Sequence, residues 1–239
     1  MRGTFAYLRK QSDQDQKGEI TLIGLGDQIV LIMSLSALLY GIYLLISRKP
    51  PLYFRLIVAA VGCHILGYLF NVCEYFVTDG LYDVNLIRYL GSIGCFLFFL
   101  TTSYGYMDGI MDDKTPQMRK ARILALAAPV FLIALLIPNI LFGTSLMVKI
   151  LYTILWIPAI LSSYFNLKHA IIPDMGFGFV KAIKPFNVAA LAFTVFQLVH
   201  LTLWNFCDWM PLLISGILFG SSCVAMIVTA DKGIKKWAL

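Results

Sequence analysis

The sequence has little charge, and this absence excludes an ordinary soluble domain. Lys, Arg, Asp and Glu make up 13% of the 239 residues, apolar residues make up 59%, and the mean hydropathy is +0.81. A soluble domain carries roughly a quarter charged residues, which keep its exterior in water. The composition therefore predicts an integral protein of the cell membrane, with the lipid bilayer as its surroundings.

Motifs for catalysis and for metal binding are lacking as well. The five cysteines form no CxxC pair, the three histidines form no HExxH motif, and no GxSxG is present. No lysine lies inside the last apolar run, from Met210 to Ala230, which argues strongly against a retinal Schiff base. We therefore expect a protein that is not an enzyme and holds neither a cofactor nor a metal.

Long apolar runs are what the sequence does have, and a run of roughly 20 residues can cross a bilayer core. Polar breaks separate them: Arg48 to Pro51 ends the first run, and the charged stretch 108–120 follows the third. Proline cannot continue a helix, and charge belongs at the membrane interface. We predict an all-α, polytopic membrane helical bundle with seven transmembrane helices, at 20–47, 54–78, 86–108, 121–143, 146–168, 185–207 and 210–230.

Lysine and arginine are spread unevenly over the two ends of these predicted helices. The first, third and fifth loops and the C-terminal tail hold 13 of the 19, and the remaining segments hold 6. Cytoplasmic loops carry the excess, so the N-terminus is predicted outside and the C-terminus inside. The net charge of +6 then needs no nucleic-acid partner. The predicted parts are a polar extracellular tail (1–19), a transmembrane domain (20–230) and a short basic cytoplasmic tail (231–239).

Polar residues inside the predicted helices are the main candidates for a site, because burying them in lipid is costly. In the second helix, the polar residues His64, Tyr68, Asn71 and Tyr75 fall on one stripe, with Glu74 at its edge. Those of the sixth helix also gather on one side. Both stripes extend toward the outer end, where Glu74 and Arg88 are a candidate pair. We expect a small-molecule ligand site open to the outside, formed by Asn71, Glu74, Arg88, Tyr89, Gln197, His200, Trp204 and Asp208.

The same residues also allow a purely structural interpretation. Polar groups of neighbouring membrane helices bond to one another and hold the helices together, and Tyr and Trp at helix ends are typical of the aromatic belt. For His64, a packing role is favoured over a ligand role. The cysteines are interpreted as small buried apolar side chains, and a disulfide between Cys73 and Cys207 is left open.

Two stretches of the sequence resemble a known family. The segment 88–91 (Arg-Tyr-Leu-Gly) opens a helix that ends in 104–106 (Tyr-Gly-Tyr), and 208–212 (Asp-Trp-Met-Pro-Leu) leads to 214–216 (Ile-Ser-Gly). These are similar to the seven-helix N-terminal sensor region of bacterial histidine kinases, with its Tyr-Leu-Gly start and its Asp-x-x-Pro followed by Ser/Thr-Gly. By helix count and order the resemblance covers nearly the whole chain, and it implies a bacterial sensor of signal transduction.

Members of that family continue into a cytoplasmic signalling region, often a kinase or a cyclase. This sequence ends at Leu239, shortly after the last predicted helix, without an ATP-binding or phosphoacceptor segment. We therefore expect a non-enzymatic membrane sensor or receptor-like protein. It would sense a ligand or the state of the membrane through the outward-facing polar residues and pass the signal to a cytoplasmic or membrane partner chain.

Two other functions stay open. A small-solute transporter would suit seven helices arranged as three, a linker and three, although the halves 20–108 and 146–230 show no convincing internal repeat. A membrane enzyme of lipid metabolism would need a metal or an acid–base set near one interface, and the polar residues here have no recognised spacing for either.

Overall fold

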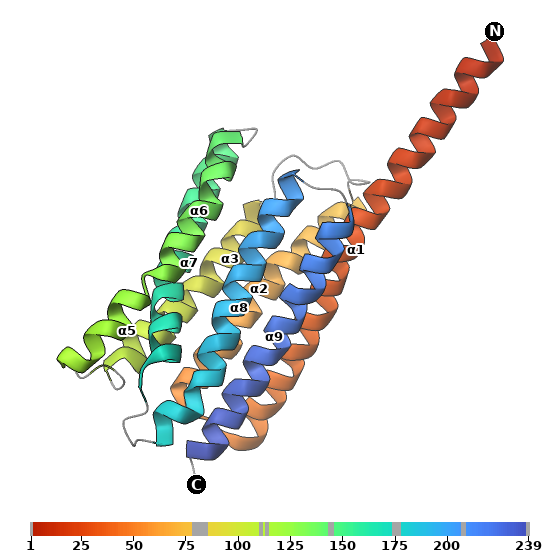
Figure 1. The fold of residues 1–239 in the computed structure, drawn as a ribbon. Coiled ribbons are helices and arrows are strands. Elements are labelled where there is room, and N and C mark those ends of the chain that lie inside the picture. The colour runs from red at the N-terminus through yellow and green to blue at the C-terminus, as the bar shows by residue number, and fades with distance from the viewer. Residues whose placement is uncertain are drawn as a thin grey trace.

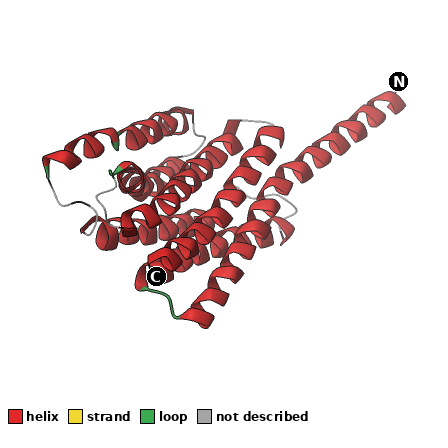
Figure 2. Ribbon diagram, turned by 60° about the horizontal axis from the view of Figure 1, so that its bottom comes forward, coloured by secondary structure: helices red, strands yellow, loops and turns green. Residues whose placement is uncertain are grey.

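The structure, a computed structural model, describes residues 2–77, 86–109, 112, 115–142, 146–173, 178–206 and 209–237. Every element within these ranges is a helix (Figure 2), which confirms the all-α class. The elements are α1 (Arg2–Arg48), α2 (Leu52–Val77), α3 (Leu86–Leu100), the π-helix η1 (Thr101–Asp108), the 3-10 helix η2 (Pro116–Met118), α5 (Arg119–Leu124), α6 (Ala127–Phe142), α7 (Leu146–Ile171), α8 (Gly178–Phe206) and α9 (Trp209–Trp237).

Six segments of the described chain are long and apolar enough to cross a membrane, as expected for a multi-pass membrane protein. The predicted span 86–108 is not among them. The α-helical part of that stretch, α3, has 15 residues and gives way to the π-helix η1 at Thr101. The six segments are Leu25–Arg48, Leu52–Glu74, Arg119–Leu141, Lys149–Ile171, Val180–Leu203 and Met210–Lys236.

Several predicted boundaries differ from the structure; α9, for example, continues to Trp237 through most of the predicted tail 231–239. Pro185, placed at the start of the sixth predicted helix, lies well inside α8, which begins at Gly178. A proline removes one backbone hydrogen bond, and membrane helices tolerate this loss. Residues 2–19, predicted as a polar tail, are helical and continuous with the first span, in keeping with the high helix propensity of their Arg, Lys, Gln and Glu residues. The side chains of residues 2–24 lie outside the described part.

The long helices pack side by side into a closed ring. Contacts run from α1 to α2, α3, α7, α8 and α9 in turn, and α9 also contacts α1. Figure 1 shows these helices running along one another. Helix α6 lies outside this ring, against α7. The chain ends marked N and C lie at opposite ends of the bundle (Figure 1). Large apolar side chains face outward, among them Ile32, Ile46 and Leu146, as expected of a surface in contact with lipid.

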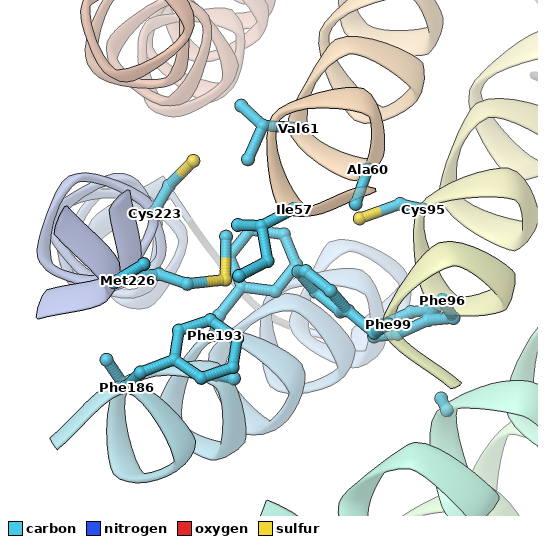
Figure 3. Packing of buried hydrophobic residues seen from close by; sticks show 14 of the residues in the cluster. Ile57, Ala60, Val61, Cys95, Phe96, Phe99, Phe186, Phe193, Cys223 and Met226 are labelled. Atoms are coloured by element: carbon cyan, nitrogen blue, oxygen red, sulfur yellow. The ribbon is translucent and has the colours of Figure 1, made fainter. Parts of the chain in front are cut away.

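The core fills the inside of the ring with aromatic and aliphatic side chains. Figure 3 shows Ile57 of α2, Phe99 of α3, Phe193 of α8 and Met226 of α9 meeting there. The rings of Phe99 and Phe193 lie 5.4 Å apart in an edge-to-face arrangement, the geometry that aromatic pairs prefer. Between helices in lipid, such close packing is a main source of stability, because burial from water contributes little.

Glycines set the closest approaches between neighbouring helices. A Cβ atom at Gly216 of α9 would lie 2.9 Å from the carbonyl oxygen of Gly26 in α1. A Cβ atom at Gly91 of α3 would lie 2.7 Å from the carbonyl oxygen of Cys63 in α2. Small residues allow membrane helices to approach this closely, so α1 packs tightly on α9, and α2 on α3.

Candidate functional site

The polar residues of the bundle gather around Asp27 of α1. The guanidinium of Arg88, in the first turn of α3, donates to both carboxylate oxygens of Asp27, with Nη1 to Oδ2 at 3.1 Å and Nη2 to Oδ1 at 3.2 Å. The two side chains are only 3% and 4% exposed. Such two-pronged, charge-assisted pairs are strong and geometrically specific. The pair therefore fixes the start of α3 against α1.

His200 of α8 bridges the same carboxylate to α9. Its Nε2 lies 3.0 Å from Asp27 Oδ1, and its Nδ1 lies 2.7 Å from the hydroxyl oxygen of Ser215. The Ser215 hydroxyl also lies within hydrogen-bond reach of the Leu212 carbonyl, at 3.0 Å. His200 is fully buried, and both of its ring nitrogens are engaged.

Tyr68 of α2 completes the group. Its hydroxyl accepts a 2.8 Å hydrogen bond from Arg88 Nη2, and the guanidinium carbon lies 4.5 Å from the centre of its ring. We call Asp27, Tyr68, Arg88, His200 and Ser215 the Asp27 cluster. It joins α1, α2, α3, α8 and α9, and it lies near the end of the bundle at which α3 and α9 begin.

Counting protons shows what the Asp27 cluster can do chemically. An ionised carboxylate only accepts hydrogen bonds, so His200 Nε2 must donate to Asp27. If the Ser215 hydroxyl donates to the Leu212 carbonyl, Nδ1 must donate as well, and His200 is a charged imidazolium. If the Ser215 hydroxyl turns to donate to Nδ1, His200 is neutral. The same heavy-atom positions thus accommodate two states that differ by one positive charge.

The predicted site residues fall into different places. Arg88 and His200 meet at Asp27. Gln197 lies about one turn deeper than His200, where its amide donates to the Ser92 hydroxyl at 2.8 Å. Tyr89 is buried, and its ring lies 5.3 Å from that of Tyr152 in α7, away from the cluster. The Gln197–Ser92 bond joins α8 to α3, and the Tyr89–Tyr152 contact joins α3 to α7; such contacts between helices are what the structural interpretation of these residues expects.

The other predicted positions are less informative. Glu74 is half-buried near the end of α2, and its pairing with Arg88 stays a prediction. Asp208, together with the side chains of Asn71 and Trp204, lies outside the described residues.

Asp27 is the candidate site residue that the sequence pattern did not single out. The available signal was its position: it is an acid inside the first apolar run, and an ionisable residue within a membrane helix is a functional candidate by default. The stripes on the second and sixth helices drew attention because several polar residues share a face there, whereas Asp27 is the one charged residue in the predicted span 20–47.

His64 packs among aromatic rings beside the cluster. Its ring centre lies 4.5 Å from that of Tyr68, 5.0 Å from that of Phe219 and 5.5 Å from that of Phe193. Neither ring nitrogen has a hydrogen-bond partner within the described structure. This environment is the one that the packing interpretation of His64 predicts.

A second charged group lies at the opposite end of the bundle, between η1 and α7. The Lys168 ammonium contacts the carboxylate of Asp108 and lies 3.0 Å from that of Asp112. His169 Nε2 lies 3.1 Å from Asp108. The Lys168 and His169 side chains are almost wholly buried. The charged loop predicted at 108–120 is therefore anchored to α7 through its acids.

A third charged group connects α1 to α9 at this same end. Asp231 of α9 pairs with Arg48 at 3.2 Å and with Lys235, and it accepts a hydrogen bond from the Tyr40 hydroxyl at 3.3 Å. In the part of the chain that the structure describes, no group of His, Cys, Asp and Glu side chains has the geometry of a metal site.

Comparison with known proteins adds no family: no protein-family model, curated protein or solved structure matches this chain. The function is therefore argued from the sites themselves.

Proposed function

We propose that the protein is a membrane sensor or receptor-like protein, in which a stimulus acts on the Asp27 cluster and changes how the helices pack. The observation that carries this proposal is His200, which is buried between the Asp27 carboxylate and the Ser215 hydroxyl. The proposed stimulus is a small polar ligand arriving from the outer side of the membrane.

The cost of the cluster supports a functional role. Removing charges from water is expensive, and apolar residues of similar size often hold helices together as well or better. Ionisable residues inside membrane helices therefore mark functional sites more often than structural ones. Because the Asp27 cluster joins α1, α2, α3, α8 and α9, a change in its charge or hydrogen bonding acts on all of these helices together.

The contact between α1 and α9 offers a path from the cluster to the other end of the bundle. Near the cluster, Gly26 meets Gly216, and further along, a Cβ atom at Gly220 of α9 would lie 2.9 Å from the Met33 side chain. At the far end, Asp231 binds Arg48. A shift of α9 against α1 would therefore reach the basic end of α9, where we propose that a partner chain reads it.

The proposal includes the topology predicted from the sequence: seven spans, with the N-terminus outside and the C-terminus inside. It is supported by α3 and η1, which follow one another without a break from Leu86 to Asp108 and so have the length of a further span. It is also supported by the bundle end at which α9 finishes, because Arg48, Arg119 and Lys168 gather there as the positive-inside rule requires.

Thermal unfolding of the purified protein in detergent tests the sensor proposal. Amino acids, amines, carboxylates and sugars are screened against the wild type, against His200→Ala and Glu74→Ala, and against the control Asn139→Ala. Asn139 is buried in α6 and bonds Thr202, away from the cluster. We expect at least one compound to raise the melting temperature of the wild type and the control, but to act less on the other two variants. The proposal fails if no compound acts, or if all four proteins respond equally.

A small-solute transporter is the second candidate, and one observation favours it. Charged groups lie at both ends of the bundle, the Asp27 cluster at one and the Lys168 group at the other, with the aromatic core between them. A carrier with alternating access needs a gate on each side of its substrate site. Accumulation of a labelled solute in proteoliposomes would establish transport, and its absence across the compounds that shift the melting temperature would favour the sensor.

A further inference from the structure

A pocket of about 330 Å³ lies at the end of the bundle opposite the Asp27 cluster, between the α1–α2 connection and the last turns of α9. Arg48 ends the first apolar span and Lys236 ends the last, so the pocket lies at the level where a membrane core meets its headgroups. It is lined by Leu44, Arg48, Lys49, Pro50, Pro51, Phe54, Asp231, Ile234 and Lys235.

The charges around the pocket favour an anion. Arg48, Lys49 and Lys235 contribute three positive charges, and Asp231 contributes one negative charge that is already engaged by Arg48 and Lys235. The balance is an excess of two positive charges. The side chains of Arg48 and Lys235 are 51% and 48% exposed, whereas that of Asp231 is 8% exposed. The accessible charge at the pocket is therefore positive.

The deeper wall of the pocket is apolar. Leu44 and Phe54 are almost completely buried, and the partly buried Ile234 lies against the same core. A ligand that matches this lining has an anionic group for the basic rim and a hydrocarbon part for the apolar wall. A membrane phospholipid has both.

Lys49 supplies a second observation that points to a ligand. It follows the last residue of α1 and has a φ of +46°, in the left-handed region. Glycine normally occupies this position after a helix, because any side chain strains the backbone there. Strain of this kind persists mainly at functional positions. A lysine here is accounted for if its ammonium is needed in the pocket that it lines.

We propose that this pocket binds the phosphate headgroup of an anionic membrane lipid, held by Arg48, Lys49 and Lys235, with its acyl chain against the half-buried Pro51 and Ile234. Basic pockets between membrane helices on the cytoplasmic side are suited to such headgroups. This inference goes beyond the proposed function, and it does not depend on the Asp27 cluster.

Native mass spectrometry of the detergent-purified protein, titrated with phosphatidylglycerol or phosphatidylcholine, tests the proposal. We expect phosphatidylglycerol to bind more tightly, and each of Lys49→Gly and Lys235→Gln to weaken it about fivefold, the factor expected for one basic residue at an anionic lipid surface. Lys120→Gln removes an exposed lysine from α5, away from the pocket, and should leave the affinity unchanged. Lys49→Gly should also melt no lower than the wild type, because glycine relieves the strain.

Three results would overturn the proposal. The first is equal affinity for the two lipids. The second is equal weakening by Lys120→Gln, which would show that general surface charge, and not the pocket, attracts the lipid. The third is binding of inorganic phosphate or glycerol phosphate as tight as that of phosphatidylglycerol, which would make the ligand a free anion.

Discussion

Both side chains of the Arg88–Asp27 ion pair are buried, so substituting one of them alone should lower the free energy of unfolding. Arg88→Met should destabilise it by roughly 3–5 kcal/mol, because the Asp27 carboxylate loses its charged partner inside the bundle. The double variant Asp27→Asn/Arg88→Met should lose much less than the sum of the two single changes. Equilibrium unfolding in mixed detergent micelles measures all three.

The exposed Arg119 of α5 provides the control for this comparison of single and double variants. Arg119→Met should change the free energy of unfolding by no more than about 0.5 kcal/mol, as is usual for surface positions. Additive effects of the two cluster substitutions would show that the Asp27–Arg88 pair is not energetically coupled.

His64 and His200 are both fully buried, but only His200 is hydrogen-bonded, so substitution by leucine should affect stability much more at His200 than at His64. His64→Leu removes two ring nitrogens that lack partners, which offsets part of the lost aromatic contact, so we expect a change within about 1 kcal/mol. His200→Leu removes the hydrogen bonds that the imidazole makes with Asp27 and Ser215 and puts an apolar side chain beside the buried carboxylate. We expect this change to cost roughly 3 kcal/mol or more. Thermal melts in one detergent compare the two, and equal losses would contradict the assigned roles.

Individual residues also show how far sequence can locate a site in this protein. Helical periodicity placed Arg88 and His200 among the candidates, because it fixes which face of a helix a residue occupies. It cannot say which other helix that face meets. Asp27 lies 173 residues from His200 in the chain, and only the packing of α8 and α9 on α1 brings them together.

At the scale of the helix, the glycine contact between α1 and α9 makes a specific prediction. Gly216→Ala should destabilise the protein by about 1–3 kcal/mol, because the new methyl group would overlap the Gly26 carbonyl. Gly62→Ala is the matched control. Its nearest neighbour, the Leu38 side chain, lies at 3.9 Å, so it should cause no loss. If Gly216→Ala and Gly62→Ala lowered the melting temperature equally, the contact between α1 and α9 would have room for a methyl group, contrary to the structure.

Most helices could be predicted from length and composition, since long apolar runs between charged breaks leave few alternatives in a membrane. The ends were harder to predict. Pro185 has the sequence signature of a helix start, yet α8 begins at Gly178. The change to a π-helix at Thr101 has no such signature. Within this segment Ser103 donates a hydrogen bond to Asn166 of α7, a contact between distant parts of the chain that periodicity cannot predict.

For the whole molecule, the number of crossings can be tested with an impermeant thiol reagent in intact cells. Single cysteines at Ser47, Lys120 and Met147, in an otherwise cysteine-free chain, report on three points along it. With seven spans, Ser47→Cys and Lys120→Cys should react only after permeabilisation, and Met147→Cys should react from outside. If the stretch 86–108 does not cross, Ser47→Cys and Lys120→Cys will lie on opposite sides.

The central claim is that the Asp27 cluster controls the arrangement of α1 and α9 at the far end of the bundle. Spin labels on Ser47 and Lys236, both exposed near the ends of these helices, measure that arrangement by pulsed electron resonance. We predict that Asp27→Asn and His200→Ala shift the label-to-label distance by about 1–2 Å, the size typical of helix shifts in switching proteins, or add a second population of distances. Asn139→Ala should leave the distance unchanged. The same distance distribution in all four proteins would contradict the claim.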